Sequence, residues 1–521
     1  MNNNEARTIN AKRNILFGFF QVVVSQILPF ITRTILIYRF GVDYLGLNSL
    51  FTSVLSVLSL MELGFGTAVI YSMYQPAAEG DTDQICAYLA YYRSIYRVIG
   101  LTILALGLAL MPFLNHLIHD SAMPGGLNLY ICYLIFLIDT IISYLLYGYM
   151  MAIPAVYQRR DILSKVDMGM SLLQCTVKSL ALLFCSSFYF YLLTMPLITV
   201  IRNMVTVGII RKKYPGLECR YNLSADQKQN LKRKVCGLVI DKITAVSRNS
   251  IDTLCISAFI GLSVSGMYNN YYFVMTGIIA FSTMILSSMM AGVGNSIAVE
   301  SKEKNYADMR LFDFIYTAVA GWAAVCMLCL FQVFVSVWLG NNMLLGMPVV
   351  IGICTYFYIL KAGDIRWVYH EGRGLWYESR FIMIGEAAVN IVLNILLCRV
   401  LGVFGIVLAT VISVFITNFF FCPRLLFRLY FNNGRLKEYW RDHFLYAVTM
   451  LLTAGASWFI CEIVLPVPMT GEGILYSIIC LGGRLGICTL LSVGIFEAVW
   501  HRSERHKKAV EWIKKVLSAH E

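Results

Sequence analysis

The segment 237–261, GLVIDKITAVSRNSIDTLCISAFIG, is long and apolar enough to cross a bilayer, yet it carries four charged side chains. Asp241, Arg248 and Asp252 are spaced by seven and four residues, so on a helix they share one face. Lys242 lies off this face near one end, where a long side chain can extend toward the membrane surface. Because each charge near the middle of a membrane costs about 2.5–3.5 kcal/mol on insertion scales, the face is expected to point toward a partner helix or a watery cavity.

Other charged side chains also lie deep inside apolar runs. Those that we predict to contact substrate, besides the four above, are Arg33, Lys178, Arg202 and Glu62. The cations suit an anionic head group, and the planar guanidinium of arginine in particular matches the geometry of a phosphate. The carboxylates would keep a cavity hydrated, orient the arginines, bind sugar hydroxyls or carry a coupling cation.

A second interpretation of the deep charges is that they form internal ion pairs, which fix how the helices pack. It is the simpler interpretation for Asp139 or Glu386 taken singly. Further deep charges, Lys361, Asp364 and Arg366, lie in the cytoplasmic half of the tenth apolar run. For the whole set we favour a polar route through the bilayer, because a structural ion pair can often be replaced by apolar residues without loss of stability.

Bending points accompany the charges in the first two apolar runs. We predict Pro29, Gly64 and Gly66 as hinge residues, because a rocking mechanism needs helices that bend at defined positions. Proline and glycine are also ordinary constituents of membrane helices, which is an equally good explanation of these three residues.

The elements that must position these side chains follow from the composition. Of 521 residues, 58% are hydrophobic and only 14% are charged, whereas about a quarter are charged in an ordinary soluble domain. Runs of about 20 apolar residues, each long enough to cross about 30 Å of hydrocarbon, recur along the chain. We therefore predict an all-α polytopic membrane protein with about fourteen transmembrane helices. The predicted spans are 14–38, 44–72, 97–119, 128–153, 168–187, 190–210, 236–260, 265–296, 312–338, 347–368, 380–399, 402–430, 443–463 and 474–499.

The net charge of +12 is distributed unevenly between alternate loops. With a cytoplasmic N-terminus, the inner loops include the strongly basic stretch 211–234, whereas the outer turns offer only Arg39 and Arg399. This positive-inside bias predicts that both termini are cytoplasmic. The tail 501–521 places Trp512 among basic residues, as expected for an interfacial helix on anionic lipid or, alternatively, for a solvated basic tail. The charge thus indicates topology and lipid contact rather than nucleic-acid binding. The cysteines, nearly all in spans or on the inner side, are expected to pack as small apolar groups rather than to form disulfides.

Two stretches, FGVDYLGLNSLF and IGLSVSGMYNNYYF, share a glycine pattern at a constant offset. Gly41 aligns with Gly261 and Gly46 with Gly266, both 220 residues apart, and a related stretch lies at 401–410. Glycine is needed at such turns where neighbouring helices approach closely or where the backbone takes a positive φ. Chance similarity within a chain of low complexity is the alternative.

The repeat contains an even number of spans, so both copies would have the same orientation in the membrane. This predicts two pseudo-symmetric six-helix lobes around a central cavity, plus two C-terminal helices. The predicted organisation is an N-lobe (1–210), a basic cytoplasmic linker (211–235), a C-lobe (236–430), the two added helices (431–500) and a basic amphipathic cytoplasmic tail (501–521).

The stretch RTILIYRFGVDYLGLNSLFTSVLSVLSLMELGFGTAVIYSMYQPAAEGD (33–81), with YYRSIYRVIG after it, resembles the opening of bacterial polysaccharide flippases of the Wzx type. These belong to the multidrug/oligosaccharidyl-lipid/polysaccharide exporter (MOP) superfamily. The resemblance is specific over residues 1–100 and diffuse beyond them, although the number of spans fits throughout. It implies two six-helix lobes around a central cavity, often with two extra C-terminal helices. In related lipid II flippases an arginine of the first span faces the cavity, and Arg33 occupies a comparable place.

The resemblance implies a transporter, not an enzyme, in the bacterial cytoplasmic membrane. Such a protein would flip undecaprenyl-diphosphate-linked oligosaccharide from the inner to the outer leaflet by alternating access, for surface polysaccharide biosynthesis. We predict that Arg33 and Arg248 bind the diphosphate, while the prenyl tail stays in lipid. The expected partners are the lipid-linked oligosaccharide, membrane lipids and polysaccharide assembly proteins. We expect a monomer without cofactors, and leave open whether a proton or sodium ion is coupled to transport.

Three alternatives remain, and the buried charge argues against the last of them, a purely structural membrane protein. A multidrug or cation antiporter of the same superfamily would suit an acidic, aromatic cavity, whereas several deep charges here are basic. A membrane oligosaccharide polymerase or ligase would need acid and base groups on a substantial outer loop, and the predicted outer loops are short. His116 and His119 could hold a metal at an outer helix end, but only Asp120 lies near them, so we predict neither a metal site nor a catalytic residue.

Overall fold

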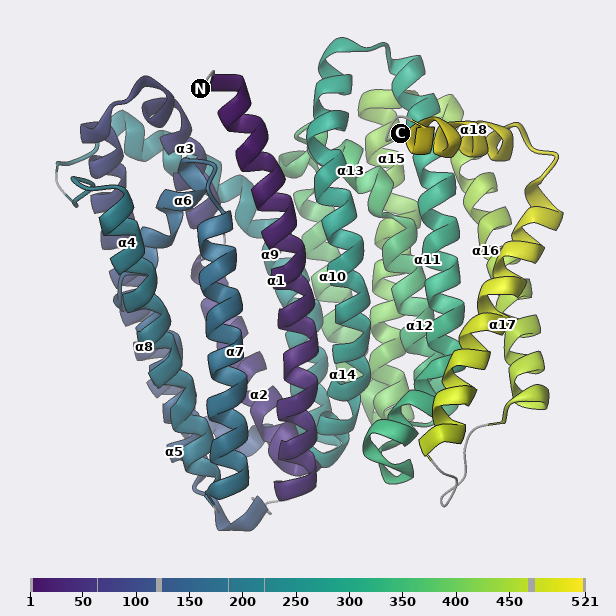
Figure 1. Cartoon of the computed structure of the whole chain (residues 1–521), viewed down its shortest axis with the longest axis horizontal. Helices are drawn as coiled ribbons and strands as arrows, with labels where there is room; N and C mark the ends of the chain where they lie inside the picture. Colours follow the sequence, from purple (N-terminus) through teal and green to yellow (C-terminus); the bar gives the residue numbers. More distant parts are fainter. Residues whose placement is uncertain are drawn as a thin grey trace. The chain divides into compact units, whose positions relative to one another are not determined.

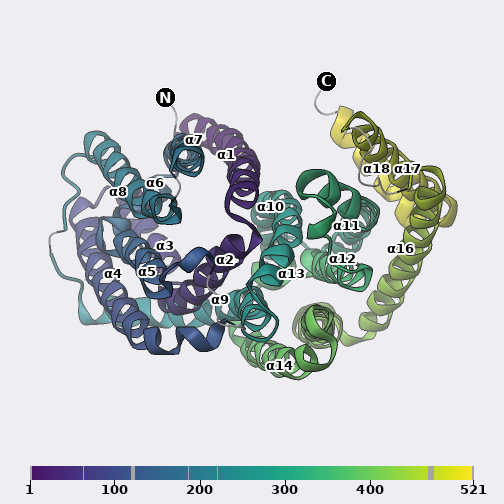
Figure 2. The same cartoon turned by 90° about the horizontal axis from the view of Figure 1, so that it is seen from below.

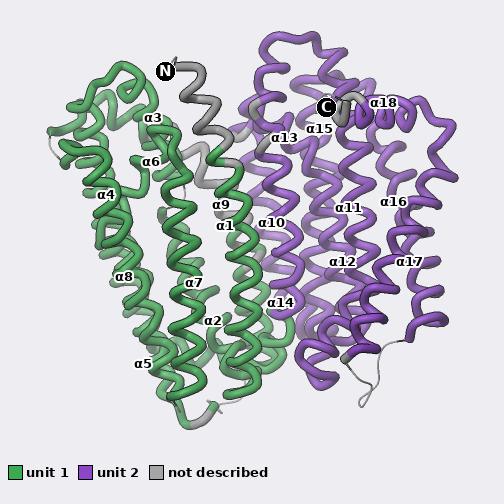
Figure 3. Tube along the Cα trace, viewed as in Figure 1, with its two compact units in different colours: residues 1–269 green, residues 270–521 purple. Residues whose placement is uncertain are grey.

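The computed structural model describes residues 3–62, 64–118, 124–185, 187–219, 221–466 and 474–518. Every regular element within these residues is helical, as predicted (Figure 1). The chain divides into two compact units, Met1–Asn269 (unit 1) and Asn270–Glu521 (unit 2), which are coloured separately in Figure 3.

Ten helices among the described residues are long and apolar enough to cross a membrane, or eleven if the bent pair Leu129–Leu145 and Gly148–Val156 forms one span. The other predicted spans correspond to shorter or merged helices. Val42–Leu58 is a shorter apolar helix, and Ser250–Phe259 is the apolar end, with described side chains, of the long helix Ala225–Phe259. The continuous segment Tyr377–Phe431 takes in two predicted spans. The prediction of an all-α, multi-pass membrane protein is confirmed.

Unit 1 is built from long helices that pack side by side. Its α-helices are α1 (Asn3–Phe40), α2 (Val42–Leu58), α3 (Phe65–Glu79), α4 (Thr82–Leu110), α5 (Leu129–Leu145), α6 (Ala152–Val156), α7 (Asp161–Phe184), α8 (Phe188–Lys213) and α9 (Ala225–Phe259). Short 3₁₀ turns extend or join them at η1 (Ser59–Glu62), η2 (Met111–Leu117), η3 (Pro124–Gly126) and η4 (Gly148–Met151). α1 runs along α7, and α7 packs in turn against α8, as the end-on view of Figure 2 shows.

The boundary between the compact units differs from the predicted lobe boundary. The sequence placed the end of the N-lobe at residue 210 and the linker at 211–235, whereas unit 1 extends to Asn269. The reason is that α9, predicted as the first span of the C-lobe, packs against α2 and α3. The assignment of six-helix lobes around a central cavity stays a prediction.

Unit 2 contains most of α10 (Leu262–Val299) and every later helix. These are α11 (Lys302–Leu339), α12 (Met347–Ala362), α13 (Asp364–Gly372), α14 (Trp376–Phe415), α15 (Cys422–Leu426), α16 (Leu436–Val464), α17 (Ile474–Trp500) and α18 (Glu504–Ser518). They are supplemented by the 3₁₀ turns η5 (Asn341–Met343) and η8 (Asn433–Arg435) and the π-helical segments η6 (Ile416–Phe421) and η7 (Phe427–Phe431). α11 lies at the centre of the unit, because α12, α16, α17 and α18 all pack against it.

The described part of the C-terminal tail packs against its own unit. The ring of Trp512 on α18 lies edge-on to Phe312 of α11, and Arg505 forms an ion pair of 2.6 Å with Asp442 of α16. Burial lowers the pKa of Arg505, but its contacts with Tyr446 and Asp442 outweigh this and raise that pKa above its ordinary value. The described part of the tail is therefore held by contacts with α11 and α16, and its contact with anionic lipid stays a prediction.

The repeated glycines meet one another where α2 and α10 begin. Gly41 and Gly261 precede these helices with φ values of 107° and 137°, which L side chains rarely adopt. A Cβ on Gly46 would overlap the carbonyl oxygen of Leu262, and a Cβ on Gly266 would overlap that of Val42. Both predicted roles of glycine, positive φ and close approach, are confirmed. We call this contact, formed by residues 41–46 and 261–266, the glycine crossing.

In the glycine crossing, each of the two repeated segments makes the same contacts with the other. The residue that follows Gly41 touches Gly266, and the residue that follows Gly261 touches Gly46, so equivalent positions exchange equivalent contacts. At its centre, Ser263 donates a hydrogen bond to the carboxylate of Asp43, its equivalent 220 residues earlier. This is the pattern of a two-fold interface, here formed within one chain.

The third glycine stretch behaves in the same way within α14. Gly402, with a φ of 57°, interrupts the helical geometry between two predicted spans. A Cβ on Gly405 would overlap the carbonyl oxygen of Leu397. The chain thus uses glycine for one purpose in all three places, which is to turn tightly between apolar helices that touch through their backbones.

Candidate functional site

Two of the basic residues that we predict to bind substrate lie near the same tyrosine in unit 1. The guanidinium of Arg33 on α1 lies near the phenol of Tyr191 on α8 and donates a hydrogen bond of 3.4 Å to the carbonyl oxygen of Asn269. The Nζ atom of Lys178 on α7 lies 5.3 Å from the centroid of the Tyr191 ring. Because α7 packs against both α1 and α8, the buried Tyr191 brings together cations that are far apart in the sequence.

A carboxylate completes this group, which we call the Tyr191 cluster (Arg33, Asp139, Lys178 and Tyr191). Asp139 on α5 interacts electrostatically with Lys178 and accepts a hydrogen bond of 2.6 Å from the hydroxyl of Thr199. Within the cluster the cations outnumber the carboxylate. An excess of positive charge held by helices of low polarity favours an anionic ligand, since the interaction of charges is stronger in such surroundings than in water.

Arg202, a third predicted cation, has a carboxylate partner of its own. It forms an ion pair of 2.7 Å with Asp167 of α7, and the two side chains are 41% and 23% exposed. Asp167 was not predicted, because it lies one residue before the predicted span 168–187. The arrangement favours a packing role for Arg202, and its role in substrate binding stays a prediction.

We expect Arg202→Ala to leave transport within a few-fold of the wild type. A partly exposed ion pair is worth at most about 1 kcal/mol, so the loss of stability should also be small. The exchange of the two residues, Asp167→Arg with Arg202→Asp, should restore the melting temperature that either single change lowers. A loss of transport in Arg202→Ala that this exchange does not repair would show instead that Arg202 binds substrate.

Glu62 lies in a group of tyrosines rather than beside a cation. It accepts hydrogen bonds from the hydroxyls of Tyr96 at 2.5 Å and Tyr144 at 2.8 Å, and Tyr92 donates in turn to Tyr96 at 2.7 Å. We call these four residues the Glu62 cluster. Its tyrosines were not predicted, since their hydroxyls come from α4 and α5, far from Glu62 in the sequence, and leave no local sequence pattern.

The predicted hinge residues differ in their surroundings. Gly64 has a left-handed φ of 92° and separates η1 from α3, so the second predicted span is broken there. A Cβ on Gly66 would lie 2.7 Å from the hydroxyl oxygen of Tyr92, which explains the glycine by close packing. Pro29 lies inside α1, which continues through it. That these positions act as hinges stays a prediction.

The charged face of α9 is only partly described. Asp252 is buried at 3% exposure, with the hydroxyl of Tyr268 at 3.5 Å, and Arg248 is half-buried. The side chains of Asp241 and Lys242 lie outside the described residues. The binding roles predicted for these four residues stay predictions.

Three of the deep charges of unit 2, Lys361, Asp364 and Arg366, have local partners. Lys361 forms an ion pair of 2.7 Å with Asp364, which also accepts a hydrogen bond of 2.6 Å from Tyr316. Arg366 donates to the backbone carbonyl and side-chain oxygens of Asn418. These contacts favour the interpretation that charges in this region fix helix packing. His116, which the sequence analysis considered as a metal ligand in unit 1, is exposed. His119 and Asp120 lie outside the described residues.

No protein-family model and no curated protein sequence matches the chain. Solved structures do match it. An inward-facing multidrug resistance MATE family transporter of the MOP superfamily is 12% identical, with a TM-score of 0.59, over 79% of this chain and 96% of that one. The lipid II flippase MurJ, in an inward closed conformation, is 13% identical, with a TM-score of 0.59, over 93% and 98%. A MOP superfamily transporter from Pyrococcus furiosus, whose binding pocket is described as having reverse polarity, is 12% identical, with a TM-score of 0.54, over 82% and 96%.

The chain therefore has the fold of the MOP superfamily transporters. The resemblance found in residues 1–100 is confirmed at the level of this fold, and about fourteen transmembrane helices are consistent with it. Both multidrug transporters and a lipid flippase share the fold, so the function must be argued from the residues of this chain.

Proposed function

We propose that this protein moves a polyprenyl-diphosphate-linked oligosaccharide from the cytoplasmic to the outer leaflet of a bacterial plasma membrane, for surface polysaccharide biosynthesis. The observation that carries the proposal is the Tyr191 cluster, in which Arg33 and Lys178 meet at one tyrosine with Asp139 as the nearby carboxylate. A diphosphate offers several oxygens to such a pair of cations, and a guanidinium can bind two of them at once.

The energetics of the proposed movement are favourable for an anion. With both termini in the cytoplasm and a negative interior, a diphosphate that leaves the inner leaflet gains about 2.3 kcal/mol per charge for each 100 mV. The prenyl tail can remain in lipid, so only the polar head group needs a route lined by protein. Alternating access between two lobes would provide that route without an open channel.

The proposal is tested with the purified protein in vesicles that contain a fluorescent polyprenyl-diphosphate disaccharide. An enzyme that cannot cross the membrane and acts only on exposed head groups reports how fast the lipid changes leaflet. We expect the diphosphate-linked lipid to change leaflet faster than in protein-free vesicles. The exchange rate of a neutral glycolipid of the same tail length should not increase. Equal movement of the charged and neutral lipids, or of neither, would refute the proposal.

A second candidate function, the export of organic cations, is favoured by the Glu62 cluster. Glu62 accepts hydrogen bonds from the hydroxyls of Tyr96 and Tyr144, and the rings of Tyr92 and Tyr144 both contact that of Tyr96. The cluster thus combines negative charge with aromatic rings, which are the features that recognise such cations. Both oxygens of Glu62 already accept tyrosine hydroxyls, which makes a structural role equally consistent. Ion-gradient-driven export of a cationic dye from the same vesicles, abolished by Glu62→Gln, would establish this function in place of the first.

A further inference from the structure

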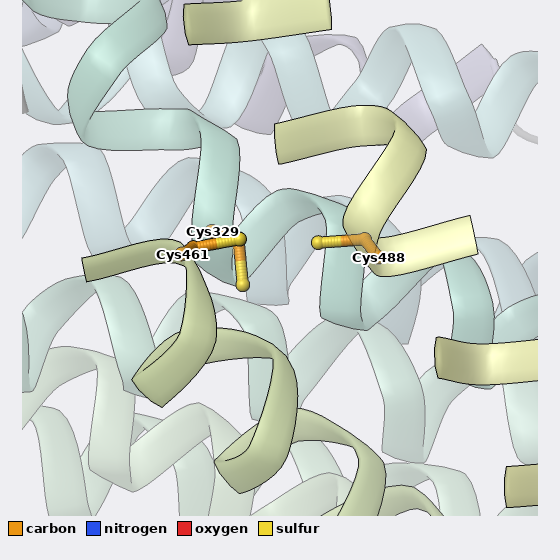
Figure 4. A group of neighbouring side chains, drawn as sticks. All are labelled: Cys329, Cys461 and Cys488. Carbon is orange, nitrogen blue, oxygen red and sulfur yellow. The ribbon is translucent and has the colours of Figure 1, made fainter. Parts of the chain in front are cut away.

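Three helices of unit 2 bring cysteine side chains together outside the site described above. Cys329 of α11, Cys461 of α16 and Cys488 of α17 have sulfur atoms that all lie within 4.8 Å of one another, and these side chains converge in Figure 4. Cys326, one turn before Cys329 on α11, is in contact with the sulfur of Cys488. Cys329, Cys461 and Cys488 are at most 1% exposed. Four thiols from three helices thus occupy one small, enclosed region, which we call the cysteine cluster.

Apolar packing alone explains a buried cysteine but not this convergence. A thiol packs well as a small apolar group and needs no other sulfur nearby for this. Cys354 of α12 is a buried cysteine outside the cysteine cluster. Sulfur ligands around a tetrahedral zinc ion, at about 2.3 Å from the metal, lie about 3.8 Å from one another. The spacing of the Cys329, Cys461 and Cys488 sulfur atoms is compatible with that geometry after small rotations of the side chains. Cys326 touches the sulfur of Cys488 and would have to turn toward the other two to become the fourth ligand. A pair of cysteines separated by two residues, here Cys326 and Cys329, is also a common element of such sites.

A buried arginine supplies positive charge beside the thiols. Arg484, one turn before Cys488 on α17, is 1% exposed. It donates hydrogen bonds of 2.8 Å to the backbone oxygens of Cys329 and Leu465 and forms an ion pair of 3.0 Å with Glu462. Cationic groups nearby favour the thiolate, which is the form that binds metal. The bond to the carbonyl of Cys329 also fixes the backbone that carries one ligand, as outer-shell partners do at metal centres.

We propose that Cys326, Cys329, Cys461 and Cys488 form a structural site for a thiophilic divalent cation, with Zn²⁺ as the reference ion. Binding breaks four S–H bonds and forms four metal–sulfur bonds, and the protons leave to solvent. The site has four protein ligands and is enclosed, as structural rather than catalytic zinc sites are. It joins α16 and α17 to α11, and it does not depend on the proposed transport function.

The test uses the full-length protein in detergent, purified without chelators. Elemental analysis should find about one zinc ion per chain, and replacement by Co²⁺ should give the visible absorption of a tetrahedral cobalt–thiolate centre. Cys461→Ser and Cys488→Ser should lose the metal and the absorption. Cys354→Ser, a buried cysteine outside the cluster, should keep both.

Two results on the wild-type protein would overturn the proposal, even if the serine variants fail to fold. One is folded protein that contains no zinc and develops no cobalt–thiolate absorption when Co²⁺ is added under reducing conditions. The other is a disulfide between two of the four cysteines, seen by mass spectrometry as a cross-linked peptide in protein alkylated before reduction.

Discussion

Arg33→Ala should slow the flipping of the diphosphate-linked glycan by roughly ten- to a hundredfold, because a hydrogen bond to a charged group contributes about 1.5–3 kcal/mol. The guanidinium lies near Tyr191 and donates a hydrogen bond to the carbonyl oxygen of Asn269. Arg33→Lys keeps the charge but loses the two-point contact with phosphate, and we expect an intermediate rate. Lys178→Ala should act in the same direction. The double variant should show less than the product of the two effects, because both cations share one tyrosine.

The measurement is the initial rate of leaflet exchange in vesicles with equal amounts of protein. Arg39→Ala is the matched control, since Arg39 is an exposed arginine at the end of the same helix. It should flip lipid at the wild-type rate. If the Arg33→Ala and Lys178→Ala proteins both flip lipid at the wild-type rate, the Tyr191 cluster has no part in substrate binding. The proposal that its cations bind the diphosphate would then be wrong.

Gly46→Ala should remove most of the folded protein from the membrane fraction. The added Cβ would overlap the carbonyl oxygen of Leu262, and a backbone atom cannot rotate away as a side chain can. Overpacking of this kind costs about 1–3 kcal/mol where side chains yield, and more where two helix backbones must separate. Gly266→Ala should have a comparable effect, because the contact that it disturbs is the equivalent one at the carbonyl of Val42.

The readouts for the glycine variants are the yield of monodisperse protein and its melting temperature. Gly208→Ala in α8 is the control, since a Cβ there meets no atom within 4 Å. It should be neutral or stabilising by up to about 1 kcal/mol, because alanine is the better helix former. A Gly46→Ala protein that melts at the wild-type temperature would mean that α2 and α10 do not touch through their backbones.

The helical architecture was accessible from the sequence because a membrane leaves few choices. An apolar run of about 20 residues must satisfy its own backbone hydrogen bonds in lipid, and a helix does this locally. The glycines were informative for a related reason. Their constant offset predicted special backbone conformations, and the positive φ of Gly41 and Gly261 confirms them. The predicted bounds of the lobes and linker stay predictions. The packing of α9 on α2 and α3 could not be predicted, because it depends on contacts that no local pattern encodes.

The candidate site could be predicted only one residue at a time. Arg33 and Lys178 could be predicted because a charged residue is conspicuous in an apolar run. Their common neighbour Tyr191 could not be predicted, because tyrosine is frequent in such runs. Which helix faces meet is decided by tertiary packing, so the pairing of Arg202 with Asp167 was also missed. The same limit applies to the cysteine cluster, where only the spacing of Cys326 and Cys329 is visible locally.

The pair at the centre of the glycine crossing, Asp43 and Ser263, differs from what a symmetric dimer would place there. In a dimer of two identical subunits, a residue on the two-fold axis faces its own copy. An aspartate at position 43 would then oppose a second aspartate, and the two carboxylates would repel. Here the position opposite Asp43 is occupied by Ser263, which donates a hydrogen bond to it. A pairing of unlike residues at this position requires two different sequences, so two identical copies of either segment could not form the contact that Asp43 and Ser263 form here.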